Sequence, residues 1–395
     1  MREGLAVSGE DAEEGGRRSA LDRYGKTLQG FDRKGRLRSL SPQAGIDFTS
    51  NDYLGLAGSQ CLKTAIAAAL ARGVPVGAGG SRLLRGNHSE HEALETEAAR
   101  FFGVEKVLFF ASGYAANVAL FSTLPQRDDL IVHDALIHAS THEGIAASRA
   151  RSVSVPHNDA GAFEDAIVHW RRQGGSGHPW IAVESLYSMD GDRAPIADLL
   201  CIAERHGGFL VIDEAHATGV FGAGGRGLSA GLEGRGNFLA LHTCGKALGL
   251  SGALLGGPTV LLDYLVNRAR GFIYSTAPSP LIAAGVREAL RMIEDEPPRR
   301  AALRALCQFA NREMASRLGM RGSGSQILPV MVGDNGRAVR IAGRMQAEGY
   351  DIRAIRPPTV PEGTARLRIA VTLNVDEAAI SDVFAHLAKI LEDER

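Results

Sequence analysis

From residue 46 onwards, short apolar runs alternate along the chain with longer segments in which apolar residues recur at helical spacing. Short apolar runs bounded by glycine and polar residues predict buried strands, and the longer segments predict helices. The expected strands span residues 106–110, 130–133, 180–184, 208–213, 238–241 and 252–256, and the expected helices span residues 90–102, 114–124, 162–173 and 196–206. Alternation of this kind is typical of crossover connections, so it predicts an α/β fold with a mostly parallel sheet flanked by helices.

The pattern changes near Pro278 and Pro280. Beyond them we expect helices over residues 281–294, 299–318 and 337–348, strands over residues 327–332 and 367–371, and a last helix from Asp376. This mixture predicts a smaller α+β C-terminal domain. We therefore expect an N-terminal leader and arm (residues 1–45), a large catalytic domain (residues 46–280) and a small domain (residues 281–395).

Composition narrows the classes of function. The 44 basic and 45 acidic side chains give a net charge of -1, which does not supply the basic field that nucleic-acid binding requires. The most apolar long stretch, residues 238–265, contains Lys246, several glycines and Pro258, so no membrane span is expected. The four cysteines lie far apart, which favours a reduced, cytoplasmic protein.

Three segments contain residues suited to chemistry. Asp213 ends an apolar strand, where open α/β sheets bind ligands, although it can equally cap the following turn, and His216 can be an ordinary loop histidine. Lys246 lies among apolar and glycine residues that favour a lowered pKa, although most isolated lysines are surface side chains. Residues 106–117 predict a strand, a glycine turn and a helix, whose first backbone N–H groups form an anion site.

Together these features match pyridoxal 5'-phosphate (PLP). A carboxylate pairs with its pyridine nitrogen, a lysine forms a Schiff base with its aldehyde, and a helix N-terminus binds its phosphate. The combination is far more specific than any of its parts.

The chain resembles the fold-type I PLP enzymes, and within them the α-oxoamine synthases, from about residue 48 to residue 368. The resemblance is carried by eight motifs in order: SNDYLGL (residues 50–56), GGSRLLRGNH (79–88), SGYAAN (112–117), DALIHAS (134–140), SMDGD (188–192), DEAH (213–216), TCGK (243–246) and YST (274–276). It implies an acyltransferase that joins an amino acid to an acyl thioester with loss of CO2, and a homodimer whose active site is shared between subunits.

The resemblance also implies roles for individual residues. Lys246 forms the Schiff base and acts as the base, Asp213 pairs with the ring nitrogen, and His138 stacks on the ring. The remaining implied cofactor residues are His216 and Ser188 at the ring phenolate, Gly113, Tyr114 and Thr243 at the phosphate, and Thr276 from a second subunit.

Substrate binding is implied in the same way. Arg368 is the expected clamp on the amino-acid carboxylate, assisted by Asn51, and either Arg36 or Arg38 meets the acyl group. Residues 124–130 and 356–368 most resemble the family members that condense L-alanine with a pimeloyl thioester in biotin synthesis. Other members, which join glycine or serine to a different acyl-CoA, and an aminotransferase remain alternatives.

Three other sequence patterns give weaker support to other classes of protein. Residues 222–227 satisfy G-x-G-x-x-G, but they do not lie directly between a strand and a helix as a dinucleotide site requires. His138, His142 and Glu143, or His88 and His91, lack the spacing of a zinc site, so no metal is expected. Cys244 is expected to pack, and the acidic start of the chain argues against a transcription regulator.

Overall fold

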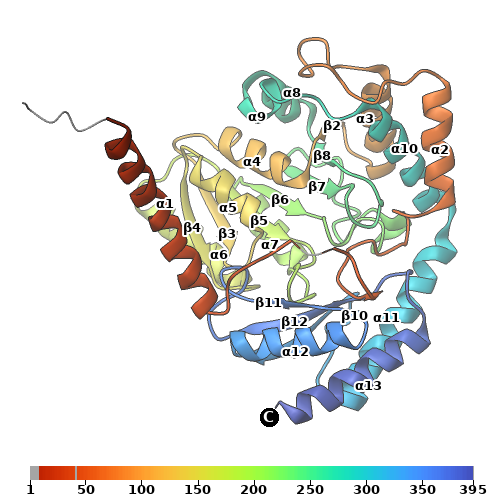
Figure 1. Cartoon of the computed structure of the whole chain (residues 1–395). Helices are drawn as coiled ribbons and strands as arrows, with labels where there is room; N and C mark the ends of the chain where they lie inside the picture. Colours follow the sequence, from red (N-terminus) through yellow and green to blue (C-terminus); the bar gives the residue numbers. More distant parts are fainter. Residues whose placement is uncertain (1–8, 41, 395) are drawn as a thin grey trace, which may run out of the picture. The chain divides into compact units, whose positions relative to one another are not determined.

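The computed structural model describes residues 9–40 and 42–394 (Figure 1). The described residues divide into two compact units, which we call the sheet unit (residues 48–329 and 369–384) and the terminal unit (residues 9–40, 42–47, 330–368 and 385–394). Residues 281–329, expected in the small domain, group with the sheet unit, so the three-part division of the sequence stays a prediction. Within the expected leader, Gly9–Arg33 forms helix α1, and residues 1–8 lie outside the described residues.

The sheet unit is built on a seven-stranded sheet in the order β2-β8-β7-β6-β5-β3-β4. Its strands are β2 (Lys106–Phe110), β3 (Leu130–Asp134), β4 (Arg151–Val155), β5 (Pro179–Glu184), β6 (Phe209–Asp213), β7 (Phe238–Thr243) and β8 (Ala253–Gly257). The neighbouring pairs are parallel except those of β8, which runs antiparallel to both β2 and β7. The predicted α/β fold with a mostly parallel sheet is therefore confirmed.

Both faces of this sheet are buried. Along β6, Val211 packs into one hydrophobic cluster, whereas Leu210 and Ile212 pack into another. This alternation places the two clusters on opposite faces of the strand. The helices of the sheet unit are α2 (Gln60–Ala71), α3 (Ser89–Phe102), α4 (Gly113–Thr123), α5 (Ala139–Ala146), α6 (Ala160–Arg172), α7 (Ile196–Arg205), α8 (Thr259–Arg268), α9 (Arg270–Ile273), α10 (Pro280–Asp295) and α11 (Pro297–Leu318), together with the 3-10 turn Ala223–Gly225.

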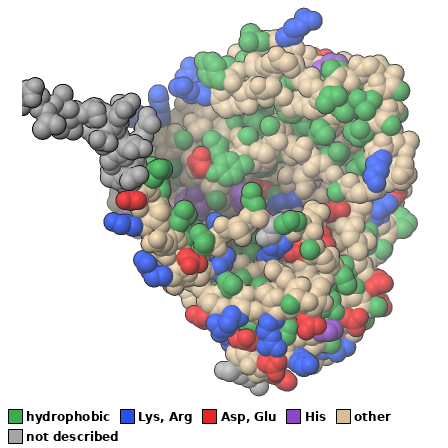
Figure 2. Space-filling view, in the orientation of Figure 1, with side chains coloured by type: hydrophobic (Ala, Val, Ile, Leu, Met, Phe, Trp, Pro, Cys, Tyr) green, Lys and Arg blue, Asp and Glu red, His purple; other side chains and the backbone are tan. Residues whose placement is uncertain are grey.

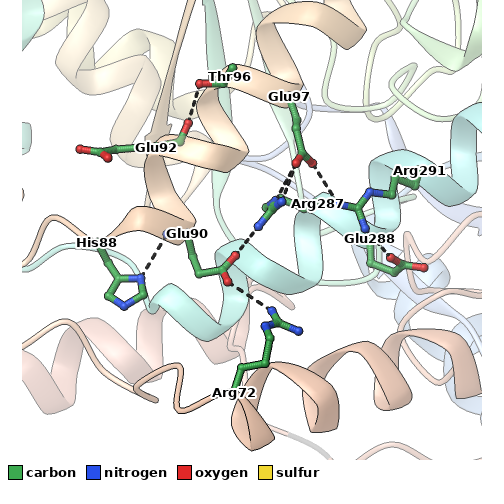
Figure 3. Close-up of polar contacts among 9 residues, drawn as sticks. All are labelled: Arg72, His88, Glu90, Glu92, Thr96, Glu97, Arg287, Glu288 and Arg291. Atoms are coloured by element: carbon green, nitrogen blue, oxygen red, sulfur yellow. Dashed lines mark hydrogen bonds and ion pairs between the residues drawn. The ribbon is translucent and has the colours of Figure 1, made fainter.

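Helix α10 packs against α2 and α3, and charged side chains join the three helices. Arg287 of α10 binds Glu90 and Glu97 of α3, and Glu90 also binds Arg72, which follows α2 (Figure 3). Arg291 lies near Glu97 at 3.5 Å and Glu288 at 3.2 Å. Every arginine of this group therefore has a carboxylate partner.

The rest of the chain forms smaller elements. Two short strands, β1 (Ile46–Asp47) and β10 (Tyr350–Asp351), pair in parallel in the terminal unit. A three-stranded sheet has the order β11-β12-β9, with β11 (Arg353–Ile355) antiparallel to β12 (Ala365–Ala370) and with β9 at Ile327–Gly333. The last helices are α12 (Asn335–Ala347) and α13 (Glu377–Asp393).

Basic and acidic side chains lie interspersed on the face shown in Figure 2, consistent with a net charge of -1. Across the described residues, no helix has the length and apolar character needed to cross a membrane.

Candidate active site

Functional side chains gather where the parallel strands of the large sheet end. Glu184 ends β5, Asp213 ends β6 and Thr243 ends β7, and Glu184 and Asp213 are directly opposite each other in the strand register. Phe110, the last residue of β2, and Thr243 both pair with Ala253 of β8, so β2 ends at the same edge. Ligands bind at this edge in open α/β sheets.

Lys246 is the first member of a hydrogen-bonded chain. Its Nζ lies 2.6 Å from Nε2 of His216, whose Nδ1 lies 2.6 Å from the hydroxyl of Tyr53. Which atom donates in each of these two contacts depends on the tautomer of the imidazole. Tyr53 in turn donates to Oδ1 of Asn51 at 2.9 Å. The sequence predicted Lys246, His216 and Asn51 separately, and this chain brings them together through Tyr53.

Asp213 is fixed by helix α4. Its carboxylate accepts from Nδ2 of Asn117 at 2.9 Å and from the backbone N–H of Ala215 at 2.9 Å. Asn117 also donates to the Ser140 hydroxyl at 3.0 Å, and that hydroxyl lies 2.7 Å from Nδ1 of His138. Asp213 and His138 are thus held by one network.

His138 connects the two networks electrostatically. Its pKa is lowered, first by removal from water and then by the positive charge of Lys246, while the negative charge of Asp213 acts in the opposite direction. An amine and a carboxylate therefore both lie near one imidazole ring. These are the groups expected at the aldehyde, the nitrogen and the face of a pyridine ring.

The start of α4 has the backbone geometry that the predicted phosphate site requires. Ser112 caps this helix and accepts from the Ala115 N–H at 3.1 Å, while Gly113 and Tyr114 are its first two residues. A Cβ at Gly113 would lie 3.8 Å from the Cβ and Oγ1 of Thr243, so the helix start and the threonine are neighbours. The first N–H groups of a helix bind phosphate well.

Glu184 is a buried carboxyl group beside Asp213 whose role the sequence did not indicate. It is 2% exposed, its Oε2 accepts from the Ser188 N–H at 3.1 Å, and its Oε1 has no hydrogen-bond partner in the described part of the chain. Burial and the negative charge of Asp213 raise the pKa of Glu184 to about 8. Burial therefore favours the protonated form of Glu184, and its Oε2 holds the backbone of Ser188 at the site.

Two predicted cofactor residues, Tyr114 and Thr276, have exposed side chains. Tyr114 is exposed and binds Glu143 through its hydroxyl, with its ring edge-on to that of His138. Thr276 is exposed beyond α9, and its carbonyl accepts from Ser275. Within the described residues no hydrogen bond joins Thr276 to the other predicted cofactor residues, so its role stays a prediction.

The predicted substrate arginines belong to the terminal unit. Arg368 is buried in β12, where its backbone pairs with Arg353 of β11. Arg36 forms an ion pair with Glu362, whereas Arg38 donates to the hydroxyl of Thr359 at 3.1 Å. Their roles toward substrate stay predictions.

The structure explains two patterns that the sequence analysis set aside. A Cβ at Gly227 would lie 2.5 Å from Oε2 of Glu214, and one at Gly222 would lie 1.8 Å from the carbonyl of Gly227. The glycines of residues 222–227 therefore wrap the chain around a buried carboxylate. Cys244 is fully buried, which raises the pKa of its thiol and makes it a poor nucleophile.

The residues present fit PLP. Asp213, Lys246, His138 and the start of α4 supply a carboxylate, an amine, an aromatic ring and free N–H groups at one edge of the sheet. Gly113 begins the helix, and Thr243 adds a hydroxyl beside it. Each chemical group of the cofactor thus has a matching group in the sheet unit.

Comparisons with known proteins agree with this geometry. A family model described as aminotransferase class I and II matches residues 43–387. Over 393 residues the chain is 39% identical to 8-amino-7-oxononanoate synthase of Anaeromyxobacter dehalogenans, covering 95% of this chain and 97% of the relative.

Two solved structures are also similar. The 8-amino-7-oxononanoate synthase of Francisella tularensis aligns with a TM-score of 0.75 and 28% identity, covering 89% of this chain and 98% of its own. A structure of SPT (serine palmitoyltransferase) with PLP as an internal aldimine aligns with a TM-score of 0.82 and 25% identity, covering 88% of this chain and 87% of its own.

The chain belongs to the aminotransferase class I and II family. Within that family it belongs to the α-oxoamine synthase group, as its curated relatives and its motifs agree.

Proposed function

We propose that this protein condenses L-alanine with a pimeloyl thioester to give 8-amino-7-oxononanoate, CO2 and the free thiol carrier, a step of biotin biosynthesis. The observation that carries the proposal is the placement of Lys246 and Asp213 around His138 at the carboxyl edge of the sheet. The choice of substrates is supported by relatives such as the 39% identical synthase from Anaeromyxobacter dehalogenans. The four cysteines are free, which supports a cytoplasmic location.

The cofactor is pyridoxal 5'-phosphate. When bound, it supplies an aldehyde that combines with amines and a protonated ring that withdraws electrons from the amino-acid carbon. Lys246 would hold the aldehyde, Asp213 the ring nitrogen, His216 and Ser188 the phenolate, and His138 one face of the ring. Gly113, Tyr114 and Thr243 would hold the phosphate, with Thr276 contributed by the second subunit of a homodimer.

Lys246 is the base of the reaction. Its Nζ takes the proton from Cα of alanine, and it lies 2.6 Å from Nε2 of His216. Hydrogen bonds from Asn117 and the Ala215 N–H hold the Asp213 carboxylate in place. Its negative charge would stabilise a protonated ring nitrogen of the bound cofactor.

The bonds balance with the uptake of one proton from solvent, because the released thiol and Cα each gain a proton whereas Lys246 removes only one. A bond forms between Cα of alanine and the thioester carbonyl carbon, and the carbon–sulfur bond breaks to release the thiol. The bond from Cα to the alanine carboxylate then breaks to release CO2, and Cα regains one proton, which Lys246 is positioned to return.

Arg368 is the proposed clamp on the alanine carboxylate, with Asn51 assisting. A guanidinium group gives a carboxylate two parallel hydrogen bonds and sets its angle. Arg368→Ala is expected to weaken alanine binding by about 10- to 100-fold, the effect of losing one charge-assisted contact. An unchanged affinity for alanine, measured by spectral titration, would rule out the clamp.

For the acyl group we favour Arg38 over Arg36. Arg36 is already paired with the Glu362 carboxylate, whereas the partner of Arg38 is the neutral hydroxyl of Thr359. A guanidinium that faces a neutral group retains more of its capacity to bind a substrate carboxylate.

The decisive assay is incubation of the purified protein with L-alanine and pimeloyl-CoA, with CoA and CO2 measured together. The proposal predicts that both are released in equal amounts and only when both substrates are present. An aminotransferase would release neither CoA nor CO2. Pimeloyl carrier protein, tested in parallel, identifies the natural thioester.

A second candidate, serine with palmitoyl-CoA, is raised by the structural similarity to serine palmitoyltransferase. A panel of glycine, alanine and serine with pimeloyl-CoA and palmitoyl-CoA separates the two. Faster turnover of serine with palmitoyl-CoA would replace the proposed substrates while leaving the α-oxoamine synthase chemistry in place.

A further inference from the structure

Helix α11 borders a cavity of about 590 Å³ within the sheet unit, which we call the α11 cavity. Its wall is completed by Arg193 and by the segments around Phe221 and Ser325. The volume is in the range of small-molecule sites, roughly 300 to 1,000 Å³. The residues that line it include none of the predicted cofactor residues.

Four arginines line this cavity: Arg193, Arg300, Arg304 and Arg312. Three of them, with Gln308, occupy every fourth position of α11, so they lie along one side of the helix. None of the four forms an ion pair with a carboxylate of residues 20–40 or 42–394. Of the acidic residues nearby, Glu296 binds Arg299, and Glu313 binds Arg317, although the charge of Arg312 also helps to lower the pKa of Glu313.

This arrangement is electrostatically unfavourable for the protein alone. Like charges four residues apart on a helix repel each other. Burial lowers the pKa of Arg300, and the charge of Arg304 lowers it further. The neighbouring helix α10 shows the opposite arrangement, since Arg287 and Arg291 both face carboxylates (Figure 3).

The cavity also has an apolar and well-ordered floor. Leu303 and Cys307 are buried beneath it, and the guanidinium of Arg193 lies 4.8 Å from the centre of the Phe221 ring. Asn311 fixes the edge by donating to the carbonyl of Cys307 at 2.6 Å and accepting from the Gly324 N–H at 2.9 Å. A matching ligand therefore carries both anionic groups and a flat apolar part.

We propose that the α11 cavity binds an organic polyanion of the nucleotide class, with its phosphates on Arg300, Arg304 and Arg312 and its base against the apolar floor. Guanidinium groups bind phosphate through paired, charge-assisted hydrogen bonds. Two sources offer this chemistry: a free nucleotide, and the nucleotide end of CoA, which rests on the proposed function.

The test is titration of the purified holoenzyme with ADP by calorimetry. The double variant Arg304→Gln/Arg312→Gln is expected to bind ADP at least about ten-fold more weakly than the wild type, because it loses two charge-assisted contacts. Arg317→Gln, on the same helix but paired with Glu313, is the matched control and is expected to bind normally. The double variant is also expected to be at least as stable as the wild type, because like-charge repulsion is relieved.

Two results would overturn the proposal: no ADP binding up to millimolar concentration, or binding that the double variant leaves unchanged. Turnover then distinguishes the two sources. If the double variant raises both the KM for pimeloyl-CoA and the Kd for ADP, the cavity binds the nucleotide end of CoA. If the double variant raises only the Kd for ADP, the ligand is a free nucleotide. Because ADP binding is measured without turnover, a failure of the proposed reaction leaves this test intact.

Discussion

The sheet unit contains two groups of charged side chains that are built in opposite ways. In the first, which we call the Lys246 cluster, Lys246, His216, Asp213 and Glu184 stand close together, and Oε1 of Glu184 is left without a partner among the described residues. In the second, the Arg287 cluster (Arg72, Glu90, Glu97, Arg287 and Arg291), each arginine faces at least one carboxylate (Figure 3). In the Arg287 cluster, carboxylates paired with arginines stabilise the packing of α10. In the Lys246 cluster, several titratable groups lie close together and shift one another's pKa, which is typical of catalytic sites.

The two clusters also respond to pH in opposite directions. Hydrogen bonds to Arg287 lower the pKa of Glu97, and Arg287 and Arg72 lower the pKa of Glu90 although burial opposes them. Their stabilisation is therefore present above the ordinary glutamate pKa of about 4.3 and is lost as the pH falls below it. Glu184, with a raised pKa of about 8, binds its proton more tightly in the folded state, so its contribution is lost as the pH rises toward 8.

The largest expected effect is that of Lys246→Ala on turnover. Loss of the base is expected to slow CoA release by about 10²- to 10⁴-fold and to abolish the yellow absorbance of the bound cofactor. The free energy of unfolding of the cofactor-free protein is expected to change by less than about 1 kcal/mol. The exposed Lys63, replaced by alanine, is the control, and a Lys246→Ala protein with normal turnover would remove the distinction between the clusters.

Arg287→Ala is the matching change in the second cluster. We expect the free energy of unfolding to fall by about 2 kcal/mol, because two partly buried carboxylates lose their charged hydrogen-bond partner. Urea unfolding measures the effect, with the more exposed Arg291→Ala as a control that changes stability by less than about 1 kcal/mol. Turnover per folded molecule should stay unchanged, and equal stability of the Arg287→Ala protein would show that the cluster adds nothing to the packing of α10.

Glu184→Gln tests the opposite pH behaviour. Between about pH 4.5 and pH 8 the wild type should lose up to about 1.4 kcal/mol of stability per pH unit through this carboxyl group. Glutamine cannot ionise, so the variant should lack this contribution, and its remaining pH dependence comes from other shifted groups such as Glu214, His157 and His242. An identical slope in the two proteins would refute the raised pKa, and the exposed Glu348→Gln is the control.

Tyr53→Phe is expected to give the smallest effect. The change removes two hydrogen bonds of the Tyr53 hydroxyl, one with His216 and one with Asn51. Loss of the contact that positions His216, worth about 1 kcal/mol, should lower kcat about five-fold while the KM for alanine changes less. A positioning role also predicts an altered pH dependence of kcat, which loss of packing alone would not produce. Tyr264→Phe, on the surface of α8, is the control; an unaltered kcat in Tyr53→Phe would exclude the role.

Much of the sheet was predictable because its strands are short, continuous apolar runs. The expected strand over residues 106–110 coincides with β2, and the expected end of another at Asp213 is the end of β6. Strand β4 was missed because its sequence, Arg-Ser-Val-Ser-Val, is mostly exposed at the edge of the sheet and lacks that signal. Helix α5 was missed because it has only eight residues.

Some residues of the site were likewise predictable from the sequence, and others were not. Lys246 and Asp213 were predicted because each lies in a distinctive local setting and because a single cofactor needs both. Tyr53 and Asn117 lie within recognised motifs, but their roles depend on contacts with residues 163 and 96 positions away in the chain. Only the fold brings such residues together, so spacing along the sequence gave no sign of them.

The most direct test of the account is the location of the cofactor. The holoenzyme would be reduced with borohydride, digested and analysed by peptide mass spectrometry. The account predicts a pyridoxyl adduct on the peptide that contains Lys246 and on no other lysine. An adduct on a different lysine, or none on a fully loaded protein, would contradict the assignment of this site.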